Sequence, residues 1–92
     1  MSFQMTIMDV FSIRGRGTVV TGRVENGTVR VGDEVELTNT NGTQTTTVTK
    51  IELFHKKLNQ ATAGDNVGIF LQDITKDDVQ SGDLLTGTTQ RW

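Results

Sequence analysis

The chain has 92 residues, of which 34% are hydrophobic and 22% are charged, and its formal net charge is −2. This length predicts one domain over residues 1–92, and the composition is typical of a globular protein, which excludes a disordered chain. The absence of cysteine excludes disulfides and thiolate metal sites, and the apolar runs are too short for a transmembrane helix. Because the balance of charge is slightly acidic, any RNA contact would need a local cationic patch.

Valine, isoleucine and threonine are frequent, the chain has ten glycines, and proline is absent. Strand-like segments recur at short intervals between turns of glycine, asparagine and aspartate, which is typical of an antiparallel sandwich or barrel. The predicted strands cover Gln4–Ile13, Thr18–Val24, Thr28–Val29, Glu34–Leu37, Thr45–Phe54, Asn66–Leu71 and Asp83–Thr86. The sequence therefore predicts an all-β fold.

The first predicted strand has an interrupted alternation. Its apolar side chains of one parity are Met5, Ile7, Phe11 and Ile13. Asp9 breaks this pattern, which indicates either an inward polar group or a β-bulge.

The turn Arg14–Gly17, which leads into the second strand, contains two arginines and two glycines. Glycine permits positive φ and a close approach of the backbone to a ligand, so this segment predicts a hairpin with a cationic tip. Arg14, Arg16 and Arg23 are the cations that lie closest together in this part of the sequence. The alternative is that these arginines flank a hairpin and only face solvent.

Further turns are marked by Asn26-Gly27, Asn41-Gly42 and Gly64-Asp65, since these residue types tolerate left-handed φ. Alternation and β-branching across Thr38–Thr49 favour a protruding hairpin over a disordered linker. The dipeptide Gly-Asp begins at Gly32, Gly64 and Gly82, and its irregular spacing indicates reused turn chemistry, not an internal repeat.

One segment, Asp73–Gln80, does not resemble a strand. It predicts a single helical turn with Thr75 as its N-cap and the pair Asp77-Asp78 at its positive end. Ile74 and Val79 would anchor this turn to the core.

Catalytic and metal chemistry finds little support. The glycine-rich run Gly15–Gly22 lacks the lysine of a P-loop and lies between strands, so it predicts no nucleotide hydrolysis. His55 is the sole histidine, and we expect it at the surface, at a strand end, where it forms neither a triad nor a zinc site. Helix capping explains Asp77-Asp78 better than Mg²⁺ binding does. The sequence therefore predicts no enzyme activity, no metal and no cofactor.

Five ordered segments carry a family resemblance over about Phe3 to Gly87. They are Asp9–Val24, Gly32–Glu36, Val48–Phe54, Ala63–Gly68 and Ser81–Leu85. In order and spacing they resemble the second domain of translation elongation factor Tu, the β-barrel that follows the GTPase domain in translational GTPases. The resemblance implies a small closed antiparallel Greek-key β-barrel of six or seven strands, located in the cytoplasm.

The family also implies partners: the barrel packs against a GTPase domain and helps to hold the aminoacylated 3′ end of tRNA. Carried onto this chain, the residues for the RNA end would be Ile13, Gly15, Arg16, Val19, Glu52 and Phe70. The residues on the aminoacyl side would be Asp9, Phe11, Thr21 and Asn66. Ordinary barrel packing is the alternative explanation for the apolar members, whereas Glu52 on an apolar strand is less easily explained by packing.

The sequence departs from the family at four positions. Met8 replaces a usual glutamate, Phe70 replaces a common leucine, and Gln72 and Ser81 occupy positions that often hold arginine. Fewer cations reduce the attraction to phosphate. The alternative function is therefore a protein-docking barrel that contacts a GTPase or another partner without binding RNA. The beginning at Met1 and the untagged end at Trp92 favour a free-standing protein, with a piece of a larger factor as the alternative.

Overall fold

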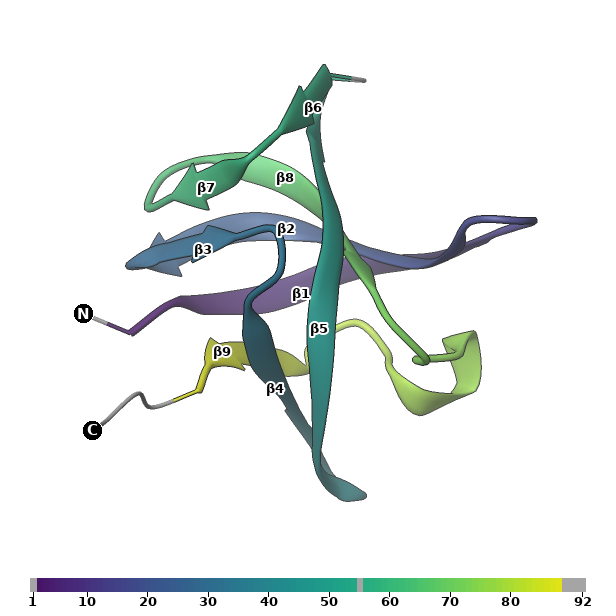
Figure 1. Cartoon of the computed structure of the whole chain (residues 1–92). Coiled ribbons are helices and arrows are strands. Elements are labelled where there is room, and N and C mark those ends of the chain that lie inside the picture. Colours follow the sequence, from purple (N-terminus) through teal and green to yellow (C-terminus); the bar gives the residue numbers. More distant parts are fainter. Residues whose placement is uncertain (1, 55, 89–92) are drawn as a thin grey trace.

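The computed structural model describes residues 2–54 and 56–88, and these residues are almost entirely β-structure (Figure 1). The elements in this part of the chain are β1 (Gln4–Ile13), β2 (Gly17–Asn26), β3 (Thr28–Arg30), β4 (Glu34–Asn39), β5 (Gly42–Leu53), β6 (Lys56–Leu58), β7 (Gln60–Thr62), β8 (Asn66–Leu71), the 3₁₀ turn η1 (Lys76–Asp78) and β9 (Leu84–Gly87). The predicted all-β class is confirmed. Among these residues, no helix is long and apolar enough to cross a membrane.

Six strands close into an antiparallel barrel. They are hydrogen-bonded in the order β4-β9-β1-β2-β8-β5, and β5 pairs with β4 to complete the circle. Strands β4, β5 and β8 are successive neighbours and β9 returns beside β4, which is Greek-key topology. Strand β6 adds to β5 outside the circle, and β3 pairs with β7 separately. The predicted closed Greek-key barrel is therefore confirmed.

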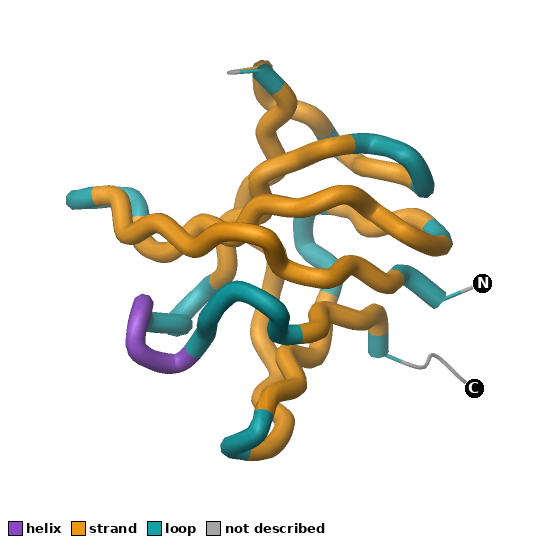
Figure 2. Tube along the Cα trace, turned by 180° about the vertical axis from the view of Figure 1, so that it is seen from behind, coloured by secondary structure: helices purple, strands orange, loops and turns teal. Residues whose placement is uncertain are grey.

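The two ends of the barrel differ. The start of β1 pairs with the end of β9, where Gln4 lies opposite Thr86. The β1–β2 hairpin extends from the opposite end, as both views show (Figures 1 and 2). Any ligand at the tip of this hairpin would therefore lie far from the start of β1 and the end of β9.

The barrel interior is filled by side chains from all six barrel strands and from the segments that cover its ends. The core consists of Phe3, Met5, Ile7, Val20, Val24, Val29, Val35, Leu37, Val48, Ile51, Ala61, Val67, Ile69, Leu71, Ile74, Val79 and Leu85. Most of them are β-branched, and such side chains pack well on a pleated surface. Among the buried hydrophobic residues that the structure describes, Val19 and Phe70 do not belong to this core.

A bulge in β1 explains the interrupted alternation. Ile7 lies opposite Gly22, but Asp9 lies opposite Thr21, so β1 contains one extra residue at Met8. Asp9 is exposed, so the bulge interpretation was correct and the inward polar group was wrong. Because an extra residue reverses the alternation, Phe11 does not continue the inward face and is 51% exposed. The single parity predicted for β1 is therefore wrong beyond Ile7.

The other strand predictions need smaller changes. Strand β5 begins at Gly42, three residues before the predicted start, and pairs with β4 in the hairpin predicted across Thr38–Thr49. The tip of this hairpin projects from the barrel (Figure 1). Strands β6 and β7 were missed because their residues, Lys-Lys-Leu and Gln-Ala-Thr, include only one β-branched side chain. The prediction for His55 lies outside the described residues.

The three Gly-Asp dipeptides form the same turn. Their glycines have nearly equal positive φ: 98° at Gly32, 98° at Gly64 and 97° at Gly82. In each turn the aspartate Oδ2 accepts a hydrogen bond from the backbone N–H three residues earlier. These donors are Arg30 to Asp33, Thr62 to Asp65 and Gln80 to Asp83, each at 2.9 Å. The prediction of reused turn chemistry is confirmed.

The predicted helical turn is the 3₁₀ turn η1, which follows Thr75. The Asp78 carboxylate accepts hydrogen bonds from the Thr75 backbone N–H and hydroxyl. Ile74 and Val79 are both buried and anchor the turn to the core, as expected.

The three Asp turns allow a matched stability test. Asp83 is only 7% exposed and also accepts a hydrogen bond from Asn39 Nδ2. Replacing it by alanine leaves two partly buried donors without an acceptor, so Asp83→Ala should lower the free energy of unfolding by about 1–3 kcal/mol. Asp33→Ala and Asp65→Ala, in the more exposed turns, should cost about 0.5–1 kcal/mol each. Urea unfolding of the three variants measures the difference, and equal losses would contradict the role of burial.

Candidate functional site

Eight residues form two rows across four neighbouring strands on the outside of the barrel. The row that we call the Phe70 row consists of Phe11 on β1, Val19 on β2, Phe70 on β8 and Lys50 on β5. The row that we call the Glu52 row consists of Asp9 on β1, Thr21 on β2, Gly68 on β8 and Glu52 on β5. Directly opposite residues of paired strands point to the same face, so both rows face away from the core.

The rows bring together most of the residues that the sequence assigned to a site. Phe11, Val19 and Phe70 share one row, and Asp9, Thr21 and Glu52 share the other. These six come from both predicted groups, for the RNA end and for the aminoacyl side.

The remaining four predicted residues border the rows. Ile13 is half-buried at the end of β1, and Asn66 lies one outward position beyond Gly68 on β8. Gly15 and Arg16 belong to the β1–β2 turn, where Gly15 has φ of 78° as expected. A Cβ added to Gly15 would find no atom within 4 Å, so this part of the turn is open to solvent.

Arg16, Lys50 and Glu52 form an ion cluster at the boundary of the two rows. Glu52 Oε2 lies 3.0 Å from Lys50 Nζ and 3.3 Å from Arg16 Nη2. Lys50 and Glu52 are two residues apart on β5, so both side chains point outward, and the β1–β2 hairpin brings Arg16 to the same carboxylate. The cationic tip and Glu52 therefore border one surface.

The same cations cover an aromatic ring. Arg16 Cζ and Lys50 Nζ each lie 5.3 Å from the centre of the Phe70 ring. At this distance the positive charge interacts favourably with the face of the ring. Phe70 is only 3% exposed although its strand position points away from the core, so its surroundings on the outer face cover it.

A shallow hollow of about 260 Å³ adjoins the Glu52 row. It is lined by Met8, Thr21, Gly22, Glu52, Phe54, Asn66, Val67 and Gly68. Gly68 has no side chain to fill the hollow, and a Cβ at this position would lie only 3.2 Å from Val19 Cγ2. The hollow combines exposed apolar groups, Met8 and Phe54, with the polar side chains of Thr21 and Asn66.

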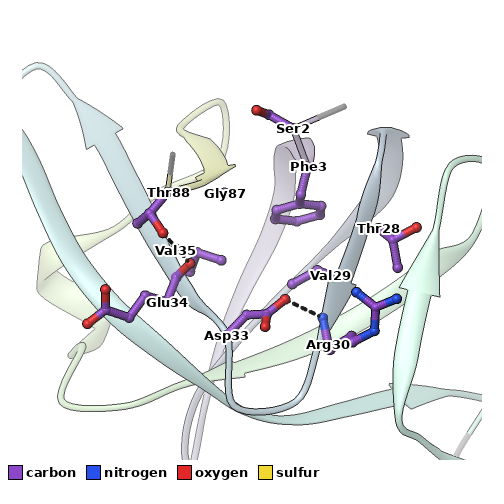
Figure 3. Close-up of a pocket in the computed structure, with 10 residues that line it drawn as sticks. All are labelled: Ser2, Phe3, Thr28, Val29, Arg30, Asp33, Glu34, Val35, Gly87 and Thr88. Carbon is purple, nitrogen blue, oxygen red and sulfur yellow. Dashed lines mark hydrogen bonds between the residues drawn. The ribbon is translucent and has the colours of Figure 1, made fainter. Parts of the chain in front are cut away.

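Another hollow, of about 610 Å³, lies near the start of β1 and the end of β9 (Figure 3). Its lining contains none of the predicted site residues: Ser2, Phe3, Thr28, Val29, Arg30, Asp33, Glu34, Val35, Gly87 and Thr88. The Asp33 carboxylate in this hollow accepts a hydrogen bond from the Arg30 backbone N–H, as part of the Gly-Asp turn. Phe3 belongs to the core. The larger hollow therefore lies apart from the two rows and from the ion cluster.

Sequence reasoning missed two members of the rows, Lys50 and Gly68. Lys50 could have been found, because it lies two residues from Glu52 on a strand and so shares its face. The signal for Gly68 was a glycine inside a strand, which often marks a close approach of another group. In contrast, the contact of Arg16 with Glu52 joins segments 36 residues apart and has no local signal.

The ion cluster changes the acidity of Glu52. The hydrogen bond from Lys50 is the main cause and lowers the pKa of the carboxyl, while partial burial acts in the opposite direction. The charges of Lys50 and Arg16 lower the pKa further, so it lies below its ordinary value. Among the residues that the structure describes, no group of three His, Cys, Asp or Glu side chains could hold a metal ion.

This lowered pKa gives a test of the cluster. Since the Glu52 pKa is lower in the folded than in the unfolded state, its contribution to stability is complete above the ordinary pKa of glutamate. That contribution is lost as the pH falls through the folded value. Lys50→Met should raise the midpoint of the Glu52 carboxyl carbon in an NMR titration, whereas Arg30→Gln, at the other end of the barrel, should not. An unchanged midpoint in Lys50→Met would show that the ion pair does not form in solution.

Comparison with a known family agrees with the observed barrel. The model of the family Elongation factor Tu domain 2 matches residues 17–86. This range contains Val19, Thr21, Glu52, Asn66 and Phe70, while β1 and Arg16 precede it. The match covers more than half of the 92 residues, and the chain therefore belongs to the elongation factor Tu domain 2 family.

Proposed function

We propose that the two outer rows hold the aminoacylated 3′ end of a tRNA, while the barrel packs against a GTPase domain during translation elongation in the cytoplasm. Membership of the family supports a role as a β-barrel module of the translational GTPase type. The family is a non-catalytic barrel domain, so the proposal assigns the chain no reaction and no cofactor.

The chemistry of the rows suits the end of a single-stranded RNA. Such ends are held by apolar or aromatic contacts with an unstacked base and by a few hydrogen bonds to its edge. Val19, Ile13 and Phe70 supply the apolar contacts in this proposal, Glu52 accepts hydrogen bonds from the base or ribose, and Arg16 attracts the phosphate. The aminoacyl group would lie toward the shallow hollow, near Thr21 and Asn66, with Asp9 and Phe11 beside it.

One observation carries this proposal. Six of the ten residues assigned from sequence lie in two adjacent rows, and the other four border them. Residues that only fill a barrel would be divided between its inner and outer faces. The outward orientation of Asp9 and Phe11 is especially informative, because it depends on the bulge at Met8.

Binding of a labelled RNA minihelix that ends in CCA tests the proposal. We expect salt-sensitive binding that weakens by at least about fivefold in Arg16→Ala and Glu52→Ala, since each loses a contact to the nucleotide. Matched variants at the opposite end of the barrel, Arg30→Ala and Glu34→Ala, should bind as the native protein does. Fluorescence anisotropy at several salt concentrations measures both effects, and a flat titration at about millimolar protein would refute RNA binding.

A second function, protein docking without RNA, is supported by exposed apolar side chains. Phe54 is 84% exposed, Met8 59% and Phe11 51%. Met8 and Phe54 line the same shallow hollow, and Phe11 belongs to the Phe70 row. Large exposed apolar groups near one another are typical of protein-interaction sites.

Docking predicts a different set of sensitive residues. The barrel should bind the isolated GTPase domain of a translational GTPase, and Phe11→Ser or Phe54→Ser should weaken this binding by at least about tenfold because apolar anchors are lost. Val31→Ser is the matched control, since Val31 is 43% exposed and follows β3. Calorimetry with purified proteins measures the change, and equal affinities for all three variants would exclude these anchors.

A further inference from the structure

The proposed RNA site has an aromatic ring that its own charged side chains cover. Phe70 lies on the outer face opposite both Val19 and Lys50, yet its exposed fraction is only 3%. Arg16 Cζ and Lys50 Nζ both lie 5.3 Å from the ring centre. Both cations contact the same Glu52 oxygen, Oε2, so they lie on the same side of the ring. A base cannot stack there while they remain in place.

The cover is held by contacts that a ligand can replace. Arg16 is 47% exposed and Lys50 is 27% exposed, and ion pairs in contact with water are weak because solvent screens them. Each cation also interacts with the ring, but a base stacked on arginine or a phosphate offers comparable interactions. Arg16 is carried by a turn whose two glycines have open space beside them, so this side chain has room to move.

We propose that Arg16, Lys50 and Glu52 form a closed cover over Phe70, and that a ligand opens it only if it carries an anionic group next to a planar ring. The anion replaces the Glu52 carboxylate as the partner of the two cations, and the ring of the ligand then takes the space above Phe70. The carboxylate that is released is free to accept hydrogen bonds from the base or ribose. The chemical class that satisfies both requirements is a nucleotide with a phosphate on its ribose. This inference rests on the proposed function, in which the terminal nucleotide of the RNA carries such a phosphate.

The cover also assigns a role to Lys50. It is a specificity-determining residue, because its ammonium group shields the Phe70 ring when the cover is closed and binds the phosphate of the ligand when the cover is open. A neutral nucleoside could stack on the ring, but it has no anionic group to replace Glu52 as the partner of Arg16 and Lys50. Free phosphate can bind the two cations, but it has no ring that could stack on Phe70.

Titration with three small ligands, followed by NMR of the side chains, tests the cover in the full chain. Adenosine 5′-monophosphate should shift the Phe70 ring signals together with the side-chain signals of Arg16 and Lys50. Inorganic phosphate should shift the cations and leave the ring without a stacking change, and adenosine should bind at least about tenfold more weakly than the monophosphate. In the double variant Arg16→Gln/Lys50→Met, adenosine should bind more tightly than it does to the native protein, and the preference for the monophosphate should disappear.

Glu52→Gln and Arg30→Gln complete the set of variants. Glu52→Gln removes the charge that holds the cover, so inorganic phosphate should bind more tightly than it does to the native protein. Arg30→Gln, which removes a cation at the far end of the barrel, should leave all three affinities unchanged.

Three results would overturn the cover: no response of the Phe70 ring at about 10 mM monophosphate, equal binding of adenosine and monophosphate to the native protein, or a preference that survives in the double variant. The minihelix titration separates this inference from the proposed function. If the minihelix binds and the preference survives the double variant, RNA binding stands and the cover is wrong. If the minihelix fails and the monophosphate still displaces the cations and reaches Phe70, the cover stands without tRNA.

Discussion

One extra residue in β1 determines which of its side chains reach the outer face that carries the candidate site. Without the bulge at Met8, the alternation begun by Met5 and Ile7 would continue, and Phe11 would point into the barrel. The bulge reverses this order and supplies both rows with their β1 members, Phe11 and Asp9. Bulges are frequent beside functional sites for this reason, since they redirect a side chain without interrupting the sheet for long. The site therefore depends on a local irregularity of a regular barrel.

The second constraint is the shared carboxylate of Glu52. It lies within 3.3 Å of two cations that come from different parts of the chain, the β1–β2 turn and β5. This arrangement couples the position of a solvent-facing turn to a rigid strand, and the Phe70 ring lies beneath both cations. The two proposed functions, RNA binding and protein docking, would use different parts of this surface. The charged centre suits a nucleotide, whereas the exposed side chains of Met8, Phe11 and Phe54 suit an apolar partner.

Much of the fold followed from the sequence because alternation, β-branching and turn residues are local signals. They gave the barrel strands, the projecting hairpin and the repeated Gly-Asp turns. The same local logic failed for β1, where the break at Asp9 was noticed but its effect on Phe11 was not. It also failed for β6 and β7, whose six residues include only one β-branched side chain.

The family resemblance predicted a set of candidate residues but not how they are arranged. The family resemblance supplied residues from four separate strands, and the sheet places them in two rows. Lys50 was absent from that set, and no local pattern indicates that it and Arg16 lie over Phe70. Such a cover depends on strand register and on a contact between distant segments, which only the closed barrel defines.

The opposed ends of the barrel have a practical consequence. The first residues of β1 and the last residues of β9 pair with each other at one end, while the arginine-bearing bend lies at the other (Figures 1 and 2). A surface anchor or a dye attached beside Gln4 or Thr86 would point away from the Arg16 side. A molecule immobilised through this end would leave the Arg16 side of the barrel accessible to ligands in solution.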